Sequence, residues 1–286
     1  METVALSPRR LKQAQRTYYW FNLFNVISFN FLSGNIITLY AIRLGLNPFL
    51  IGLLASFVPL AQVLPLIGRM LVPMFGIIRL FGVFWMFRYI LMVPILFTPL
   101  FATDGNESIV LGLCIASVLG FNIAKGIGMT AHNPVLGAIT TERDRGSYLS
   151  RSQLVIHSGA IVTGLLIALL LGEESPLYMY TVIISIGIVS GFFATAMVFR
   201  LPEPAETKKA VGLKLFSNLI EAMRRTSFVT FILLLGVSFF SIFMVQPFLI
   251  VFMKEVYALG DNTVVYFTVI GSVGAIVMAL LSGFMI

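Results

Sequence analysis

The sequence predicts an all-α polytopic membrane protein, and three observations carry that prediction. Hydrophobic residues make up 58% of the 286-residue chain and charged residues only 11%, far from the balance of a soluble domain. The hydrophobic residues gather in stretches of about 20 or more, long enough for a helix to cross a bilayer. The charged residues lie mostly between these stretches, and the basic ones concentrate in alternate connections, as they do in membrane proteins.

Eight apolar stretches follow one another along the chain, six before its longest connection and two after it. Short connections at residues 102–107 and 173–176 predict antiparallel hairpins between spans three and four and between spans five and six. The predicted spans are Tyr18–Ile42, Pro48–Gly68, Arg79–Phe101, Ser108–Ile139, Ser152–Gly172, Leu177–Phe199, Phe228–Met253 and Thr263–Ile286.

The longest connection divides the chain into three parts: a six-helix bundle over residues 1–199, a cytoplasmic linker over 200–227, and two helices of a second bundle over 228–286. The linker opens with Leu-Pro-Glu-Pro, a sequence that ends a helix. Within it, Gly212–Arg225 carries apolar residues on one helical face and charged residues on the other. This pattern predicts a helix lying in the membrane interface; a cytoplasmic extension of the seventh span is the alternative for its last turn.

The basic residues predict the orientation. Of the 19 Lys and Arg residues, only Arg43 and Lys254 fall in outside connections when the N-terminus is cytoplasmic, and only Arg88 and Lys125 fall within spans. This asymmetry satisfies the positive-inside rule and predicts a plasma-membrane protein with a cytoplasmic N-terminus. Because the topology explains the net charge of +7, we expect a lipid bilayer as partner and no nucleic acid.

Several kinds of chemistry have no signature in the chain. Cys114 is the only cysteine, and His132 and His157 lie in different spans without metal-ligand spacing, so no metal site is predicted. No phosphate-binding loop is present, and no nucleophile lies in a pattern with a base. We therefore expect neither a cofactor nor an enzyme.

Three connections carry patterned residues. Gly45–Leu54 forms the turn into span two; glycines and arginines follow span two, with Val72 and Pro73 between them; and Pro134 precedes a Glu-Arg-Asp-Arg-Gly run after span four. Together with six spans, a cytoplasmic linker and further spans, these patterns resemble the major facilitator superfamily of transporters. The residues that match its gating signatures are Gly68, Arg69, Gly76, Arg79, Glu142, Arg143 and Arg145.

The resemblance covers nearly the whole chain in topology and implies alternating-access transport. Val72 and Pro73 stand where the family carries an aspartate, and the spacing there is one residue longer. Family members have four more helices than this chain, so we expect an incomplete transporter that represents the N-terminal eight helices. The alternatives are a truncated, transport-incompetent remnant or membrane partner module, and a complete eight-helix protein.

Polar residues inside the spans are candidates for solute contact, because they usually face a bundle interior or an aqueous cavity. Asn22, Asn25, Phe29 and Ser33 form a stripe along span one, and the resemblance implies that spans one, four and seven line a central cavity. Interhelical hydrogen bonding is the alternative for these amides. The predicted solute-binding residues are Asn22, Asn25, Lys125, His157 and Gln246.

Two cations lie in the spans, and no Asp or Glu lies deep within any of them. Lys125 shares a helical face with Asn122 and either pairs with an anionic solute or reaches the cytoplasmic surface. Arg88 is expected to reach the surface or to pair with a polar neighbour. The predicted function is secondary active transport of a small organic solute, and the two cations favour an anion. Gly120, Gly126 and Gly128 are predicted at close helix contacts.

Overall fold

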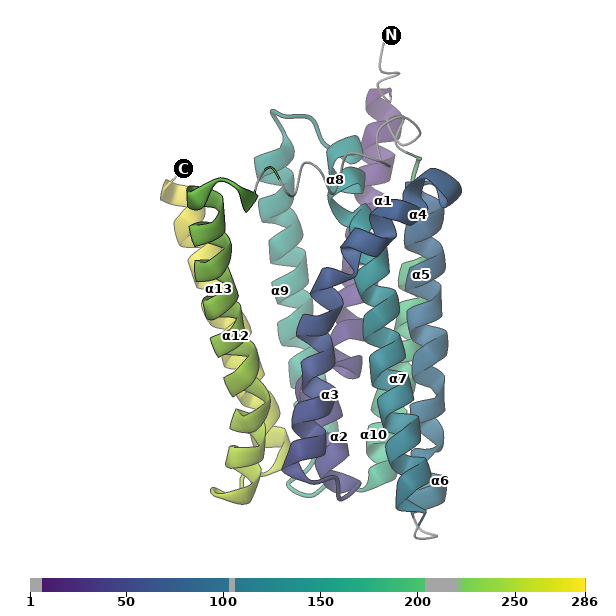
Figure 1. Cartoon of the computed structure of the whole chain (residues 1–286), viewed down its shortest axis with the longest axis vertical. Coiled ribbons are helices and arrows are strands. Elements are labelled where there is room, and N and C mark those ends of the chain that lie inside the picture. The colour runs from purple at the N-terminus through teal and green to yellow at the C-terminus, as the bar shows by residue number, and fades with distance from the viewer. Residues whose placement is uncertain (1–6, 103–105, 204–220, 222, 286) are drawn as a thin grey trace.

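The chain forms a bundle of long helices in the computed structural model (Figure 1). The structure describes residues 7–102, 106–203, 221 and 223–285, with the backbone alone at 240, 242–244, 246–247, 268 and 279–285. Helix makes up 86% of it, and the described residues include no strand. Among the described residues, six helices are long and apolar enough to cross a membrane, or seven when one bent pair counts as a span. The predicted all-α class is therefore confirmed.

The first span is broken rather than continuous. It comprises α1 (Pro8–Leu32) and α2 (Asn35–Arg43), whereas the sequence predicted one helix from Tyr18 to Ile42. Ser33 is extended, and Gly34 has φ 58° and ψ −123°, a conformation that only glycine adopts readily. The helix also begins earlier than predicted, because Pro8 suits a first helical turn.

The second span is bent by 51° and extends beyond its predicted end. It consists of α3 (Pro48–Leu60), a 3-10 turn η1 (Ala61–Val63) and α4 (Pro65–Phe75). Pro59 and Pro65 flank the bend, and each proline removes a helical N–H. The prediction that this span ends at Gly68 is wrong, because α4 continues to Phe75 and only Gly76 separates it from the next helix.

The third and fourth spans are each a long helix followed by a tighter turn and a short helix. Their combined extents, Ile77–Ala102 and Glu107–Ile139, agree with the predicted spans to within two residues at each end. The elements are α5 (Ile77–Met92), η2 (Val93–Phe97), α6 (Thr98–Ala102), α7 (Glu107–Gly128), η3 (Met129–Ala131) and α8 (His132–Ile139).

The remaining helices are unbroken. They are α9 (Arg145–Leu170), α10 (Leu177–Val198), α12 (Thr226–Glu255) and α13 (Asp261–Met285). α9 begins seven residues before its predicted start, whereas α10 matches its prediction to one residue at its end. Most of the predicted interfacial helix over 212–225 lies outside the described residues.

Small residues let the helices approach closely. α1 packs against α9 and α10, α5 against α7, α13 against α9, and α12 against α3. A methyl group at Gly120 would lie 3.2 Å from Leu91, one at Gly128 would lie 2.9 Å from Trp85, and one at Gly126 would lie 2.4 Å from a backbone oxygen. The predicted close contacts at these three glycines are therefore confirmed.

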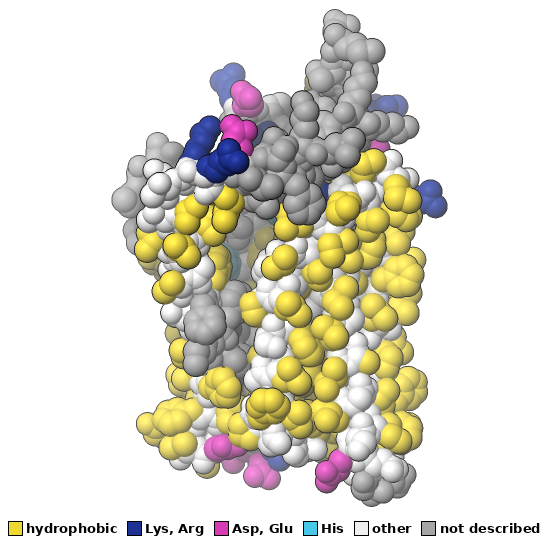
Figure 2. Space-filling model, viewed as in Figure 1, with side chains coloured by type: hydrophobic (Ala, Val, Ile, Leu, Met, Phe, Trp, Pro, Cys, Tyr) yellow, Lys and Arg dark blue, Asp and Glu magenta, His cyan; other side chains and the backbone are white. Residues whose placement is uncertain are grey.

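The surface has the distribution expected for a protein inserted in a bilayer. Figure 2 shows hydrophobic side chains along the length of the visible face and charged side chains at its two ends. α1 begins and α13 ends at the same end of the bundle (Figure 1). Many large hydrophobic side chains are exposed on the outward faces of the helices, among them Phe87, Leu169, Phe193 and Leu233. Water would not stabilise such a surface, whereas lipid does.

Candidate functional site

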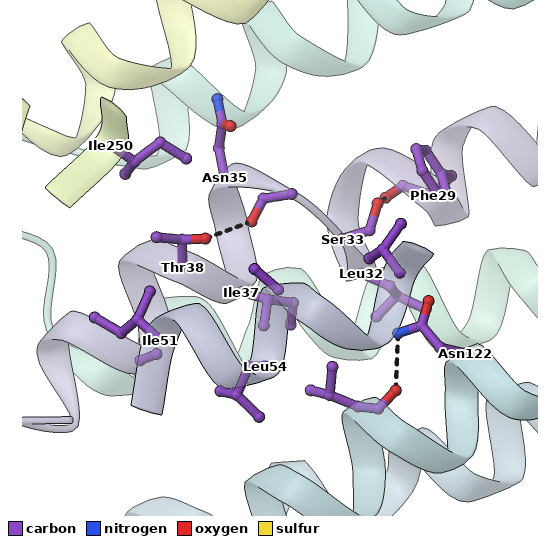
Figure 3. A pocket seen from close by; sticks show the side chains of 15 residues that line it. Phe29, Leu32, Ser33, Asn35, Ile37, Thr38, Ile51, Leu54, Asn122 and Ile250 are labelled. Atoms are coloured by element: carbon purple, nitrogen blue, oxygen red, sulfur yellow. Dashed lines mark hydrogen bonds between the residues drawn. The ribbon is translucent and has the colours of Figure 1, made fainter. Parts of the chain in front are cut away.

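A cavity of about 200 Å³ lies where the first span is broken (Figure 3). Five helices contribute to its wall: α1, α2, α3, α7 and α12. It is therefore enclosed both by helices before the linker and by the first helix after it. The lining residues are Phe29, Leu32, Ser33, Gly34, Asn35, Ile37, Thr38, Ala41, Ile51, Leu54, Ala55, Val58, Val118, Asn122 and Ile250.

The cavity lies near the middle of the apolar layer. Ser33 precedes Arg43, at the end of α2, by 10 residues, which corresponds to roughly 15 Å of helix. The apolar core of a bilayer is about 30 Å thick. A solute in this cavity would thus sit about halfway across a membrane.

The polar groups of the wall are few and are largely bonded to the backbone. Ser33 Oγ donates to the Phe29 carbonyl at 2.7 Å, Thr38 Oγ1 donates to the Gly34 carbonyl at 3.1 Å, and Asn122 Nδ2 donates to the Val118 carbonyl at 2.8 Å. These bonds satisfy polar groups that would otherwise be costly inside a membrane. The rest of the wall is mainly aliphatic.

Lys125 lies directly behind this wall. Val118, Asn122 and Lys125 follow i, i+4 and i+7 spacing and share one face of α7. The Lys125 Nζ lies 4.8 Å from the centre of the Phe29 ring, and Phe29 lines the cavity. The described residues place no carboxylate within ion-pair distance of Lys125, so its contact with Phe29 is a cation–π interaction rather than a salt bridge.

Arg88 is buried deeper than the sequence suggested. Its side chain is 1% exposed, and its guanidinium lies 4.4 Å from the Trp85 ring, 4.6 Å from the Tyr89 ring and 4.5 Å from the Phe121 ring. Neither Nε nor Nη2 has a hydrogen-bond partner among the described residues. Arg88 therefore does not reach the membrane surface. Its positive charge is held among three aromatic rings.

Of the predicted solute-binding residues, Asn22, Asn25, Lys125 and His157 do not line the cavity. Asn22 is buried on α1, while Asn25 Oδ1 accepts a hydrogen bond from Trp85 Nε1 at 3.1 Å, as the interhelical alternative proposed. His157 is half-buried on α9, and the side chain of Gln246 lies outside the described residues. Solute contact by these residues stays a prediction.

The stripe predicted on span one nevertheless leads to the cavity. Asn22 and Asn25 lie on its inner part, and Phe29 and Ser33, one and two turns further on, reach the wall. Asn122 likewise shares the predicted face of Lys125. Phe29 and Ser33, two members of the predicted stripe, therefore line the cavity, and Asn122 joins them from the predicted face of α7. Solute contact along these faces stays a prediction. The Ser33-Gly34-Asn35 run is the sequence signal of the break beside the cavity.

At the end where α1 begins, a carboxylate occupies the turn between α4 and α5. Glu203 accepts hydrogen bonds from the backbone N–H groups of Ile77 (2.5 Å) and Ile78 (3.0 Å). It thereby caps the α5 N-terminus, where a negative charge is favourable. Val72 and Pro73 in α4 carry no charge, and Glu203 brings an acidic group to the turn that follows them. Sequence reasoning treated Glu203 only as part of a helix-ending motif.

The predicted gating residues lie at this same end. Gly68 packs against Thr130, whose Oγ1 would lie 2.1 Å from a methyl group at that position, and Gly76 has φ 79° beside Glu203. Arg145 Nε donates to Thr140 Oγ1 at 3.2 Å. The four remaining residues are all exposed: Arg69, Arg79, Glu142 and Arg143. The described part of the chain shows no ion pair among these four. Their gating role stays a prediction.

The opposite end is closed by a charged cluster that the sequence did not reveal. The Asp261 carboxylate is fully buried, with Lys254 Nζ at 2.8 Å and Arg43 Nη2 at 3.2 Å. It also accepts hydrogen bonds from the Tyr180 hydroxyl (2.8 Å) and the Ser175 N–H (3.1 Å). These contacts join α2, α10, α12 and α13. In the sequence, Arg43 and Lys254 stand only as charges in outside connections.

The chain matches no protein family model, no curated protein and no solved structure. The features that bear on its function are therefore those of its own structure. They are a mid-membrane cavity, the Lys125 cation behind its wall and an end where the buried Asp261 carboxylate pairs with two cations.

Proposed function

We propose that the chain is a secondary transporter of a small organic anion, with the cavity at the break in the first span as its solute site. In this proposal, helices α1 to α10 form the six-span bundle of the major facilitator superfamily, and α12 and α13 begin the second bundle. The observation that carries the proposal is the cavity itself. It lies between the two groups of helices, near the middle of the bilayer, where solutes bind in transporters that rock one bundle against another.

The broken span supports a transport role. Backbone that leaves the helical conformation at membrane depth is tolerated where it lines a cavity or is buried in protein. Ser33 and Gly34 both lie in the cavity wall. α2 also begins here without a side-chain cap, so the positive end of its dipole lies at the cavity. The same arrangement of a discontinuous helix beside a solute site recurs in other secondary transporters.

The charges near the cavity favour an anion. Lys125 and Arg88 are embedded in the spans, while the three ion pairs of the described residues all lie at the end closed by Asp261. A unit negative charge about 8 Å from Lys125 would be stabilised by about 2 kcal/mol at an effective dielectric constant of about 20. That energy corresponds to roughly a thirtyfold gain in affinity over a neutral solute.

The proposed orientation has the N-terminus in the cytoplasm of a plasma membrane. We expect Glu174→Cys to react with a membrane-impermeant maleimide in intact cells, and Arg145→Cys to react only after the cells are permeabilised. Glu174 lies at the end of the bundle that contains Asp261, and Arg145 lies at the opposite end, where α1 begins. Cys114 is buried and should stay unlabelled. The reverse labelling pattern would contradict the orientation.

Uptake into proteoliposomes tests the transport proposal. A purified protein that contains this chain should accumulate a radiolabelled organic anion saturably, above the level of protein-free vesicles, from a panel of carboxylates, amino acids and sugars. Ala55 lines the cavity, so Ala55→Phe should fill it and reduce uptake at least tenfold. Ser56 is exposed on the same helix, and Ser56→Phe should change uptake less than twofold. Equal uptake by the two variants, or no saturable uptake of any solute, would contradict the proposal.

A further inference from the structure

We infer that the cavity selects an amphipathic monoanion: one carboxylate on a compact apolar body. The inference rests on the proposed function and names the class of solute for the same site. Three properties of the cavity lead to it: the composition of its wall, its volume and the single flexible cation behind it.

The wall excludes solutes that are polar all round. Leu32, Ile37, Ile51, Leu54 and Ile250 present only hydrocarbon. Most of the few polar side chains donate hydrogen bonds to backbone carbonyl groups, as Ser33, Thr38 and Asn122 do. A sugar would lose its hydration and leave most of its hydroxyl groups without partners, which is unfavourable in an apolar site. An apolar body gains from the same wall by leaving water.

The volume limits the size of that body. The cavity holds about 200 Å³. An engineered apolar cavity of roughly 150 Å³ in another protein accepts benzene. The cavity therefore accommodates a body about the size of one six-membered ring with a small substituent. Larger solutes would require α12 to move away from α3, where Phe248 packs against Gly52.

The charge beside the cavity is single. Lys125 lies one aromatic ring away from the interior, and its four-carbon stem lets the ammonium group turn past Phe29 toward a bound carboxylate. The Arg88 guanidinium is enclosed by three rings and does not line the cavity. One accessible cation can neutralise one negative charge. A dianion would bring a second charge into an apolar wall without a partner.

Binding of matched probes to the detergent-purified chain tests this inference without requiring transport. Isothermal titration should show benzoate binding at least tenfold more tightly than benzamide, its neutral counterpart of similar shape. Benzylammonium, terephthalate and glucose should bind at least tenfold more weakly than benzoate. Equal affinity for benzoate and benzamide, or tighter binding of the dianion or the sugar, would overturn the inference.

Variants identify the residues responsible. Lys125→Met should reduce the preference for benzoate over benzamide to less than twofold while leaving benzamide binding intact, a result that misfolding cannot produce. Lys12 is exposed on α1, and Lys12→Met should keep the full preference. If Lys125→Met does not fold, Ala55→Phe provides the second test, since it should abolish binding of both probes. A preference that survives in Lys125→Met, or binding that survives in Ala55→Phe, would overturn the assignment of the site.

The binding and uptake measurements can contradict the proposed transport and the proposed solute class independently of each other. Benzoate binding with no uptake of any anion would contradict the proposed transport and support the solute class. Saturable uptake of a sugar, without binding of benzoate, would support transport and overturn the solute class.

Discussion

Replacing Asp261 by asparagine is expected to lower the free energy of unfolding by about 3–5 kcal/mol, the usual effect of breaking a buried ion pair from one side. The Asp261 carboxylate is fully buried and faces Arg43 and Lys254. Asparagine has nearly the same shape but leaves Lys254 without a counter-charge and Arg43 with only the exposed carboxylate of Glu174, 4.0 Å away. The measurement is equilibrium unfolding of the purified chain in mixed micelles, followed by circular dichroism.

Glu174 provides the matched control for Asp261. Its carboxylate lies 4.0 Å from Arg43, but its side chain is 84% exposed, and exposed ion pairs contribute about 0–1 kcal/mol. Glu174→Gln should therefore change the free energy of unfolding by less than about 1 kcal/mol. Similar losses for the two variants would show that burial does not set the strength of this cluster.

Gly126→Leu should destabilise the chain by about 3 kcal/mol or more, at the upper end of overpacking effects. A methyl group at this position would lie 2.4 Å from the Ala61 carbonyl oxygen and 2.9 Å from Leu64 Cβ. The first of these atoms belongs to the backbone at the bend of the second span, so it cannot move aside as a side chain would. The same unfolding measurement, with a loss of benzoate binding as second readout, checks the prediction.

Gly112 is the control for Gly126 because both lie in α7. No atom lies within 4 Å of a methyl group at Gly112, and the residue is exposed. Gly112→Leu should leave stability unchanged or raise it by up to about 1 kcal/mol through helix propensity. A comparable loss for the two variants would mean that α7 tolerates no added side chain anywhere, and that the contact with Ala61 is not the cause.

The sequence predicted the structure best where crossing the membrane requires a helix of a certain length. The apolar run from Leu177 to Phe199 must be helical and about 30 Å long to cross a bilayer, and α10 matches it closely. The sequence predicted the structure less well where glycine or proline residues interrupt a helix. Ser33, Gly34 and Asn35 are short, less apolar residues within an apolar span, and Pro65 lies in a mostly apolar run. Hydropathy averaged over a whole span does not report the break or the bend there.

The site was only partly predictable from the sequence. Helical periodicity shows which residues share one face of a helix, but it does not show which residues of other helices that face contacts. The spacing of Asn25, Phe29 and Ser33 predicted one shared face of α1, and Phe29 and Ser33 line the cavity. It could not show that Asn25 faces Trp85, 60 residues away, rather than a cavity. Arg88 illustrates the same limit, since the rings that enclose it come from two helices. Such partners are set by tertiary packing, which a single sequence does not display.

The cap on α5 also has a consequence for the order in which the chain is built. The backbone N–H groups of Ile77 and Ile78 cannot donate to Glu203 until that residue has been synthesised, 126 residues after Ile77. At a synthesis rate of about 5–20 residues per second, that interval lasts roughly 6–25 s. During it, the start of the third span has no carboxylate cap, and the turn at Gly76 completes its contacts only after α10 has emerged. A ribosome-bound chain arrested before Glu203 should therefore be more readily cleaved by protease near Gly76 than one arrested after it.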